Sequence, residues 1–123
     1  MSPRDLLWIA LGGALGAPLR ALVSAWAAGT ALGRPLGTLT VNLLGSVALG
    51  LVAGHLVRVP EGGALLRSLV AVGLLGSFTT FSSFAVELIQ LAQERSLGAA
   101  CAYGAATLVT CLAGAALGLW VTA

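Results

Sequence analysis

The chain has 123 residues, of which 59% are hydrophobic and 8% charged, with a formal net charge of +2. This composition excludes a water-soluble protein, and the continuous apolar runs exclude an outer-membrane barrel, whose strands alternate apolar and polar residues. Because a helix needs about 20 apolar residues to cross the hydrocarbon core, the length predicts one all-α integral membrane domain, residues 1–123, with four spans and short loops.

Four apolar segments account for the predicted transmembrane helices. We expect these helices at residues 6–28, 36–57, 68–89 and 97–121. Glycine and proline mark the turns after the first two helices, at Gly33-Arg34-Pro35 and Pro60-Glu61-Gly62. A charged turn, Gln93-Glu94-Arg95, separates the last two helices, and Ser96 is the predicted N-cap of the fourth.

Glycine pairs spaced four residues apart recur inside these apolar segments. The pairs are Gly12 and Gly16, Gly50 and Gly54, and Gly114 and Gly118. This spacing lets helix backbones approach closely, so helix packing is its simplest explanation. We expect a compact bundle assembled from more than one copy, because four short helices hardly enclose a site that is shielded from lipid.

The six arginines are the only lysine or arginine residues, and they are nearly balanced between the two ends of the bundle. With four spans, both termini lie on one side. Arg4, Arg58 and Arg67 then lie on that side, and Arg34 and Arg95 lie on the other. The positive-inside bias is close to nil, so we expect insertion in both orientations and pairing of opposite copies as an antiparallel dimer.

Arg20 and Asn42 are the candidate polar residues of the first two predicted helices. Arg20 lies far enough along the first helix for its guanidinium to reach the distal interface. Asn42 begins a stripe of small and polar residues in the second helix, followed by Ser46 and Gly50. Its amide needs partners in the membrane. Two kinds fit: an interhelical hydrogen bond, or donation to an anion or to an unwound backbone.

The most unusual segment is Gly76-Ser-Phe-Thr-Thr-Phe-Ser-Ser-Phe84, which places hydroxyl groups and aromatic rings inside the third helix. Glycine and the paired hydroxyl residues weaken a continuous helix, so we expect a break near Gly76 to Thr80. Such a break exposes carbonyls that attract a cation and amides that attract an anion. The alternative is that the hydroxyls bond to carbonyls one turn earlier and merely bend the helix.

Phe81 and Phe84, at the end of this segment, and Glu87, just beyond it, have three-residue spacing, which places them on one helix face. The default explanation of the two rings is helix packing. The functional alternative is that their electropositive edges face an anion in a narrow path. We interpret Glu87 first as a surface carboxylate and second as a gate at the mouth of that path.

In the fourth helix, Tyr103, Thr107 and Cys111 repeat at four-residue spacing and predict a polar track along one face. Cys101 and Cys111 are expected to be buried small hydrophobic residues rather than a disulfide or metal site. No acid–base pair, nucleophile triad, metal-ligand cluster or phosphate loop is present in the sequence. We therefore expect neither an enzyme nor a nucleic-acid-binding protein.

Three segments resemble the small bacterial fluoride channels, the Fluc or CrcB family. They are Gly12-Gly-Ala-Leu-Gly-Ala-Pro-Leu-Arg20, Gly37-Thr-Leu-Thr-Val-Asn-Leu-Leu-Gly45 and Gly73-Leu-Leu-Gly-Ser-Phe-Thr-Thr-Phe-Ser-Ser-Phe84. They occur in the family's order and spacing, the third is highly specific, and the resemblance covers essentially the whole chain. The departures are Ser77, where a second glycine is frequent, Ser83, where threonine is frequent, and Cys111, where a hydroxyl is expected.

The resemblance implies a dual-topology antiparallel homodimer with two fluoride pathways and one central sodium ion, which is structural and not transported. Backbone carbonyls of Gly76 and Thr79 would hold the sodium. The fluoride pathway would be lined by Asn42, Thr80, Phe81, Ser83, Phe84, Tyr103 and Thr107. Arg20 and Glu87 are candidates for pore-mouth or structural charges.

The resemblance also implies a function: passive, fluoride-selective efflux through the inner membrane of a bacterium, which lowers cytoplasmic fluoride. Its partners would be fluoride, the lipid bilayer and a second copy of the chain. One alternative is a small multidrug-type cation exporter, which is similar in size and topology. Proton-coupled export needs a carboxylate within the first helix, and only Asp5, at the helix start, is available. A non-conducting assembly factor would leave the polar break unexplained.

Overall fold

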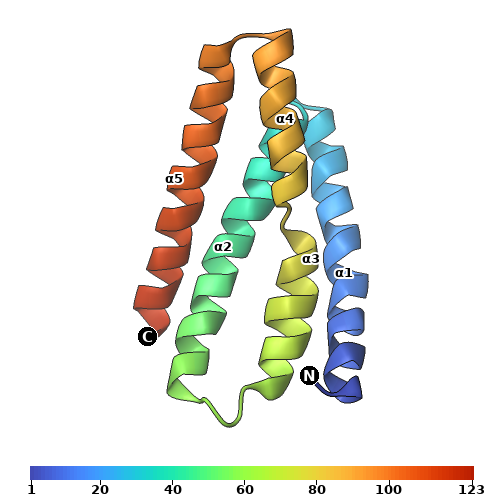
Figure 1. Cartoon of the computed structure of the whole chain (residues 1–123), viewed down its shortest axis with the longest axis vertical. Coiled ribbons are helices and arrows are strands. Elements are labelled where there is room, and N and C mark those ends of the chain that lie inside the picture. The colour runs from blue at the N-terminus through green and yellow to red at the C-terminus, as the bar shows by residue number, and fades with distance from the viewer.

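The computed structural model describes all 123 residues and is entirely helical. Its elements are α1 (Pro3–Ala28), α2 (Arg34–Arg58), η1 (Leu66–Leu75), α3 (Gly76–Phe78), α4 (Phe81–Glu94) and α5 (Leu97–Thr122). The elements η1, α3 and α4 form the third span, so the four expected membrane-length apolar helices are present. Both termini lie at the same end of the bundle (Figure 1).

Short polar motifs set where two of the helices begin. The Ser2 hydroxyl accepts a hydrogen bond from the Asp5 amide at 3.2 Å, and the Asp5 carboxylate accepts one from the Ser2 amide at 2.8 Å. This capping box starts α1 three residues earlier than expected. The Ser96 hydroxyl accepts from the Ala99 amide at 3.0 Å, which confirms Ser96 as the N-cap of α5.

Glycine brings two pairs of helices into backbone contact, α1 with η1 and α2 with α5. A Cβ atom at Gly12 would lie 2.7 Å from the Leu74 amide nitrogen, and one at Gly118 would lie 2.7 Å from the Leu51 amide nitrogen. Real Cβ atoms essentially never approach a backbone atom so closely. The spaced glycines therefore serve helix packing, as expected.

The third span changes its winding before it breaks. Its first part, η1, is a π-helix, with a wider turn than an α-helix. The chain leaves helical geometry at Thr79 and Thr80, whose extended backbones have ψ angles of 159° and 117°. Figure 1 shows α3 and α4 as two segments joined by this link. The predicted break is confirmed, although Gly76 itself is helical and the sequence did not predict the π-helix.

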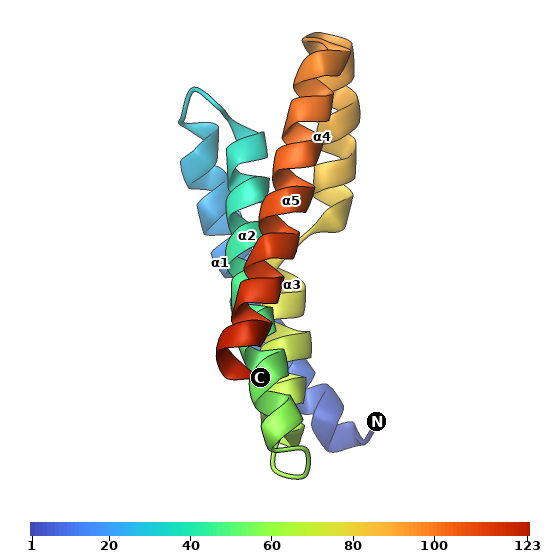
Figure 2. The ribbon, with the colours of Figure 1, turned by 90° about the vertical axis from the view of Figure 1, so that its left-hand side faces the viewer.

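Beyond the break the bundle opens. The elements η1 and α3 pack against α1, whereas α4 packs against α5 and α2 and makes no close backbone approach to α1. Figure 2 shows the pair α1 and α2 diverging from the pair α4 and α5 toward the end of the bundle opposite the termini. This opening holds most of the polar side chains discussed below.

Candidate functional site

Asn42, from α2, holds the broken backbone of the third span. Its Nδ2 donates to the Thr80 carbonyl at 2.9 Å, and the Thr80 amide donates to its Oδ1 at 2.8 Å. One side-chain amide therefore pairs both polar groups of a residue that has left the helix, which the membrane interior requires. Of the partners expected for Asn42, the structure shows the unwound backbone of a neighbouring helix.

The hydroxyl groups at the break end one helix and begin the next. The Thr80 hydroxyl caps α4 by accepting from the Ser83 amide at 3.2 Å, and it donates to the Ser83 hydroxyl at 3.1 Å. The Thr79 hydroxyl donates to the Leu75 carbonyl at 3.0 Å, one turn earlier. Bonding to the preceding turn thus occurs at Thr79, but the segment as a whole is interrupted rather than merely bent.

The break deprives several backbone carbonyls of their helical partners, among them those of Gly76 and Thr79. The Thr80 amide, which would bond to the Gly76 carbonyl in a continuous helix, is taken by Asn42. The Thr79 amide donates to the Leu75 carbonyl at 3.1 Å, and the carbonyl of Thr79 itself accepts no hydrogen bond. Oxygen atoms of this kind are the ligands that a small hard cation prefers.

Gly76 is exposed on the outer surface of the chain. A Cβ atom placed there would meet only the Ala71 carbonyl oxygen, at 3.7 Å, which is an ordinary contact. The close packing that explains glycine at positions 12 and 118 therefore does not explain it at Gly76. The backbone at Gly76 is therefore accessible from outside the single chain.

Three aromatic rings lead from the subunit surface into the bundle. Phe81 is 75% exposed and Phe84 is 6% exposed, and their ring centroids are 5.7 Å apart. The Phe84 centroid lies 5.5 Å from that of Tyr103 on α5. Both pairs are tilted, with interplanar angles of 58° and 56°, so ring edges as well as faces border this row.

Glu87 is buried, so its interpretation as a surface carboxylate is wrong. Its Oε1 accepts from the Thr38 hydroxyl of α2 at 2.9 Å, and its Oε2 accepts from the Tyr103 hydroxyl at 2.8 Å. The carboxylate is buried because α2 and α5 flank α4 at this level and supply a donor to each oxygen. Thr38 is named in the sequence analysis only within the Gly37–Gly45 segment. Its hydroxyl group, a hydrogen-bond donor inside an apolar helix, is the one feature that could have identified it as a site residue.

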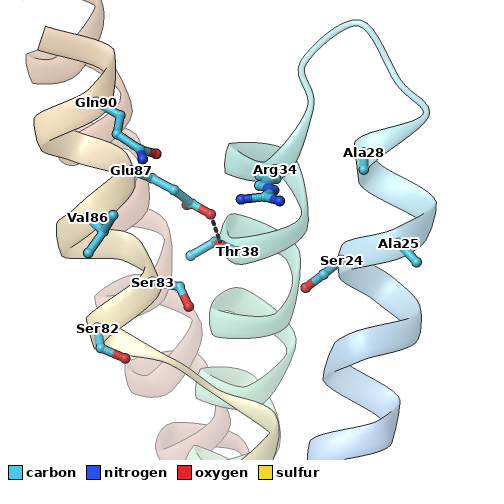
Figure 3. Close-up of a pocket in the computed structure, with 10 residues that line it drawn as sticks. All are labelled: Ser24, Ala25, Ala28, Arg34, Thr38, Ser82, Ser83, Val86, Glu87 and Gln90. Atoms are coloured by element: carbon cyan, nitrogen blue, oxygen red, sulfur yellow. Dashed lines mark hydrogen bonds between the residues drawn. The ribbon is translucent and has the colours of Figure 1, made fainter. Parts of the chain in front are cut away.

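A polar cavity of about 590 Å³ lies between α1, α2 and α4 in the opening of the bundle (Figure 3). Its lining includes Ser24, Ala25, Ala28, Arg34, Thr38, Ser82, Ser83, Val86, Glu87 and Gln90. A second cavity of about 440 Å³ shares three of these residues and extends to Tyr103. Arg20 lies one turn before Ser24 on α1 and contributes to neither cavity. Sequence reasoning did not select Ser24, Arg34 or Gln90 as site residues.

The polar track of α5 is only partly engaged within the chain. Thr107 is 4% exposed, and its hydroxyl has no hydrogen-bond partner. Cys111, one turn further along, is half-buried and has no disulfide partner. Cys101 is exposed, so the expectation that both cysteines are buried is wrong for that residue. The structure therefore brings Tyr103 into contact with Phe84 and Glu87, and leaves the buried Thr107 hydroxyl without a partner.

Comparison with known proteins supports one reading of this arrangement. Residues 7–119 match the family described as "CrcB-like protein, Camphor Resistance (CrcB)". A Hahella chejuensis protein named "Fluoride-specific ion channel FluC" is 43% identical over 123 residues, which cover 99% of this chain and 97% of the relative. A protein of the same name from Novosphingobium aromaticivorans is 41% identical, over 91% of this chain and 90% of the relative. "Fluoride-specific ion channel FluC 2" of Nocardia farcinica is 39% identical, over 96% and 84%.

Proposed function

The chain belongs to the CrcB family, and from this premise we propose that it is a fluoride channel. It is a multi-pass membrane protein and not an enzyme. The observation that carries the proposal is the 43% identity, over 99% of this chain, to a relative named as a fluoride-specific ion channel. The channel would release fluoride passively through a bacterial inner membrane and so lower cytoplasmic fluoride.

We place the fluoride pathway along α4, between the helix break and Glu87. Its residues are Asn42, Thr80, Phe81, Ser83, Phe84, Tyr103 and Thr107. Asn42 supports this placement because its amide carries two N–H groups and only one of them is used by the Thr80 carbonyl. The second N–H is free to donate to an anion beside the break. The ring edges of Phe81 and Phe84 attract an anion weakly, which lets it leave again.

The Thr107 hydroxyl supports the inner end of the same pathway. A buried hydroxyl without a partner costs about 1–3 kcal/mol, so a group that hydrogen-bonds to it is favoured there. A fluoride ion or a water molecule moving with it is small enough and accepts strongly. Tyr103 and Thr107 would then continue the row of donors that Asn42 begins.

Passive conduction is favoured over coupled export by where the carboxylates lie. The only acidic residue of α1 is Asp5, whose side chain is used in the capping box at the start of the helix. A multidrug-type exporter needs a carboxylate inside this helix, and none is present. We therefore disfavour the exporter alternative.

We further propose an antiparallel homodimer with two pores, one associated with each subunit. The near balance of arginines between the two ends favours insertion in both orientations. The break region of one subunit exposes Phe81 and Gly76 on its surface, where a second copy would cover them. Lipid alone would leave a free carbonyl at Thr79 without a polar partner.

A structural sodium ion fits the donor set at this proposed interface. The carbonyl of Thr79 accepts no hydrogen bond, and that of Gly76 has lost the Thr80 amide. These oxygens would hold the ion in each subunit, and no side chain at Gly76 obstructs the approach. When bound, sodium supplies a positive charge that offsets the negative carbonyl end of the first half-helix.

The test is fluoride efflux from liposomes that contain the purified protein. Liposomes loaded with potassium fluoride should release fluoride when a potassium ionophore is added, without a proton gradient, and protein-free liposomes should not. Liposomes loaded with potassium chloride should release chloride far more slowly. A strict requirement for a proton gradient, or equal chloride release, would contradict the proposed channel.

A further inference from the structure

Arg34 occupies a position in the structure that no sequence motif indicated. It is the first residue of α2, and its side chain is exposed. Arg34, Glu87 and Gln90 line both cavities, so this group of three lies at the boundary between them. Figure 3 shows the Arg34 guanidinium in front of α2, among the residues that line the same cavity as the Glu87 carboxylate.

The Arg34 guanidinium is not engaged with the rest of the chain. The two oxygens of Glu87 accept hydrogen bonds from Thr38 and Tyr103, on the side of α2 and α5. Arg34 itself forms no ion pair and no side-chain hydrogen bond, although it shares a cavity with Glu87. Its charge is therefore available to a mobile anion.

The charges that line the first cavity are one of each sign, Arg34 and Glu87. In the second cavity, Glu94 and Arg95 add a further charge of each sign. An anion that follows α4 must pass the Glu87 carboxylate, which repels it. Without Arg34 the first cavity would carry a single uncompensated negative charge at this point of the pathway.

We propose that Arg34 is an anion-capture residue at the mouth of the pathway. Its guanidinium offsets the charge of Glu87 and raises the concentration of small monovalent anions in the cavity from which fluoride enters. This inference rests on the proposed function and adds a residue to it. The cavity, at about 590 Å³, is much larger than one halide ion, so Arg34 sets the rate of entry and leaves discrimination between halides to the narrower part of the pathway.

A charge that acts through water has a recognisable dependence on salt. Exposed charges are screened over about 8 Å at physiological ionic strength and over about 30 Å at 0.01 M. Fields of this kind raise the local concentration of an attracted ion and its rate of entry, and the gain falls steeply as salt rises. A residue that instead shapes the pathway would act equally at all ionic strengths.

The experiment measures fluoride efflux from liposomes at about 0.01 M and about 0.5 M ionic strength, set with an impermeant salt. The variants are Arg34→Gln, which removes the charge, and Arg34→Lys, which keeps it. Arg67→Gln is the matched control, because Arg67 is also exposed but lines neither cavity. The dimer content of each preparation is checked by size-exclusion chromatography.

We expect Arg34→Gln to lower efflux roughly two- to fivefold at low ionic strength and to approach wild type at high ionic strength. Arg34→Lys and Arg67→Gln should behave as wild type at both. Equal loss at the two ionic strengths, loss in Arg34→Lys, or no loss in Arg34→Gln would each overturn the capture role. A wild-type protein that releases no fluoride would instead overturn the proposed function, and so the two failures are distinguishable.

Discussion

The two halves of the third span are nearly equal in length but differ in their surroundings. The first half, η1 and α3, packs closely against α1 through glycine and carries few polar side chains. The second half, α4, moves away from α1, packs against α5 and α2, and carries Ser83 and Glu87 toward a polar cavity. The chain that joins the halves is only Thr79 and Thr80.

Under the proposed function, this difference would separate anchoring from conduction within a single span. The first half has no room for an inserted side chain at Gly73, where a Cβ atom would lie 2.7 Å from the Ile9 carbonyl oxygen. The second half begins with Phe81, which is 75% exposed. Substitutions in the first half should therefore affect folding, and substitutions in the second should affect transport.

The largest expected effect is in the anchoring half, from Gly12→Val. Gly12 faces η1 so closely that a Cβ atom would overlap the Leu69 carbonyl oxygen. Because this obstacle is a backbone atom, the helices must separate, at a cost of about 3 kcal/mol or more. We expect loss of monodisperse protein in detergent and a lower thermal unfolding midpoint.

The control for Gly12→Val is Gly13→Ala, at the adjacent position. A Cβ atom at Gly13 would meet only the Ser77 hydroxyl oxygen, at 3.1 Å, and that side chain can rotate away. This variant should fold and transport nearly as wild type. If both variants were equally stable, close contact between α1 and η1 would not be what anchors the first half.

The next largest effect is expected in the second half, from Phe81→Ile and Phe84→Ile. Isoleucine keeps an apolar side chain but removes the electropositive ring edge. We expect fluoride efflux to fall at least about tenfold in each variant, which corresponds to about 1.4 kcal/mol in the barrier. The Phe81 variant should keep the helical content of the wild type, because this ring is mostly exposed in the single chain.

Phe78→Ile supplies the matched control, since Phe78 is the last residue of α3, before the break. It should change efflux much less than either ring of α4. If all three variants lost transport equally, aromatic residues on both sides of the break would serve one purpose, and the division between the halves would be wrong.

A smaller effect is expected at the junction itself, from Gly76→Val. Gly76 is helical and a Cβ atom has room there, so the subunit should fold. The added methyl groups would instead obstruct a second copy and the proposed sodium ion. We expect sodium to raise the unfolding midpoint of the wild-type protein, compared with a bulky organic cation, and to have little effect on the variant.

Gly98→Val is the control for Gly76→Val, because Gly98 is also exposed in a helix and its nearest neighbour, the Ser96 hydroxyl oxygen, is 3.8 Å from a Cβ atom. The sodium response should persist in this control. A sodium response that also persisted in Gly76→Val would argue against the ion site at this carbonyl.

The sequence predicted the four helices and the break because both follow from local composition. Apolar length sets the spans, and hydroxyl residues after Gly76 weaken the helix. The sequence alone did not show that Asn42 pairs with the backbone of Thr80. The two residues are 38 positions apart, and only the fold brings them together. The π-helical winding of η1 has no signal in the apolar pattern.

Burial was the property that the sequence predicted least well. Glu87 was placed on the surface because a lone carboxylate is normally solvated, but Thr38 and Tyr103 reach it from two other helices. In the sequence, Arg34 belongs to a turn. It lines the cavity because the fold brings α2 close to α4. The burial of Glu87 and the position of Arg34 therefore depend on contacts between helices, which residue type and spacing do not predict.

The smallest expected effect is that of Thr107→Val, which tests whether the second half of the pathway continues along α5. Valine has nearly the shape of threonine, and the Thr107 hydroxyl has no partner within the chain. Because a buried hydroxyl without a partner costs about 1–3 kcal/mol, its removal should not lower the free energy of unfolding. If the hydroxyl donates to fluoride or to water moving with it, efflux should fall roughly two- to fivefold, as expected when one neutral hydrogen bond is lost.

Thr110→Val is the control, because the Thr110 hydroxyl already donates to the Ala106 carbonyl at 2.7 Å. Unchanged efflux in Thr107→Val would end the pathway at Tyr103.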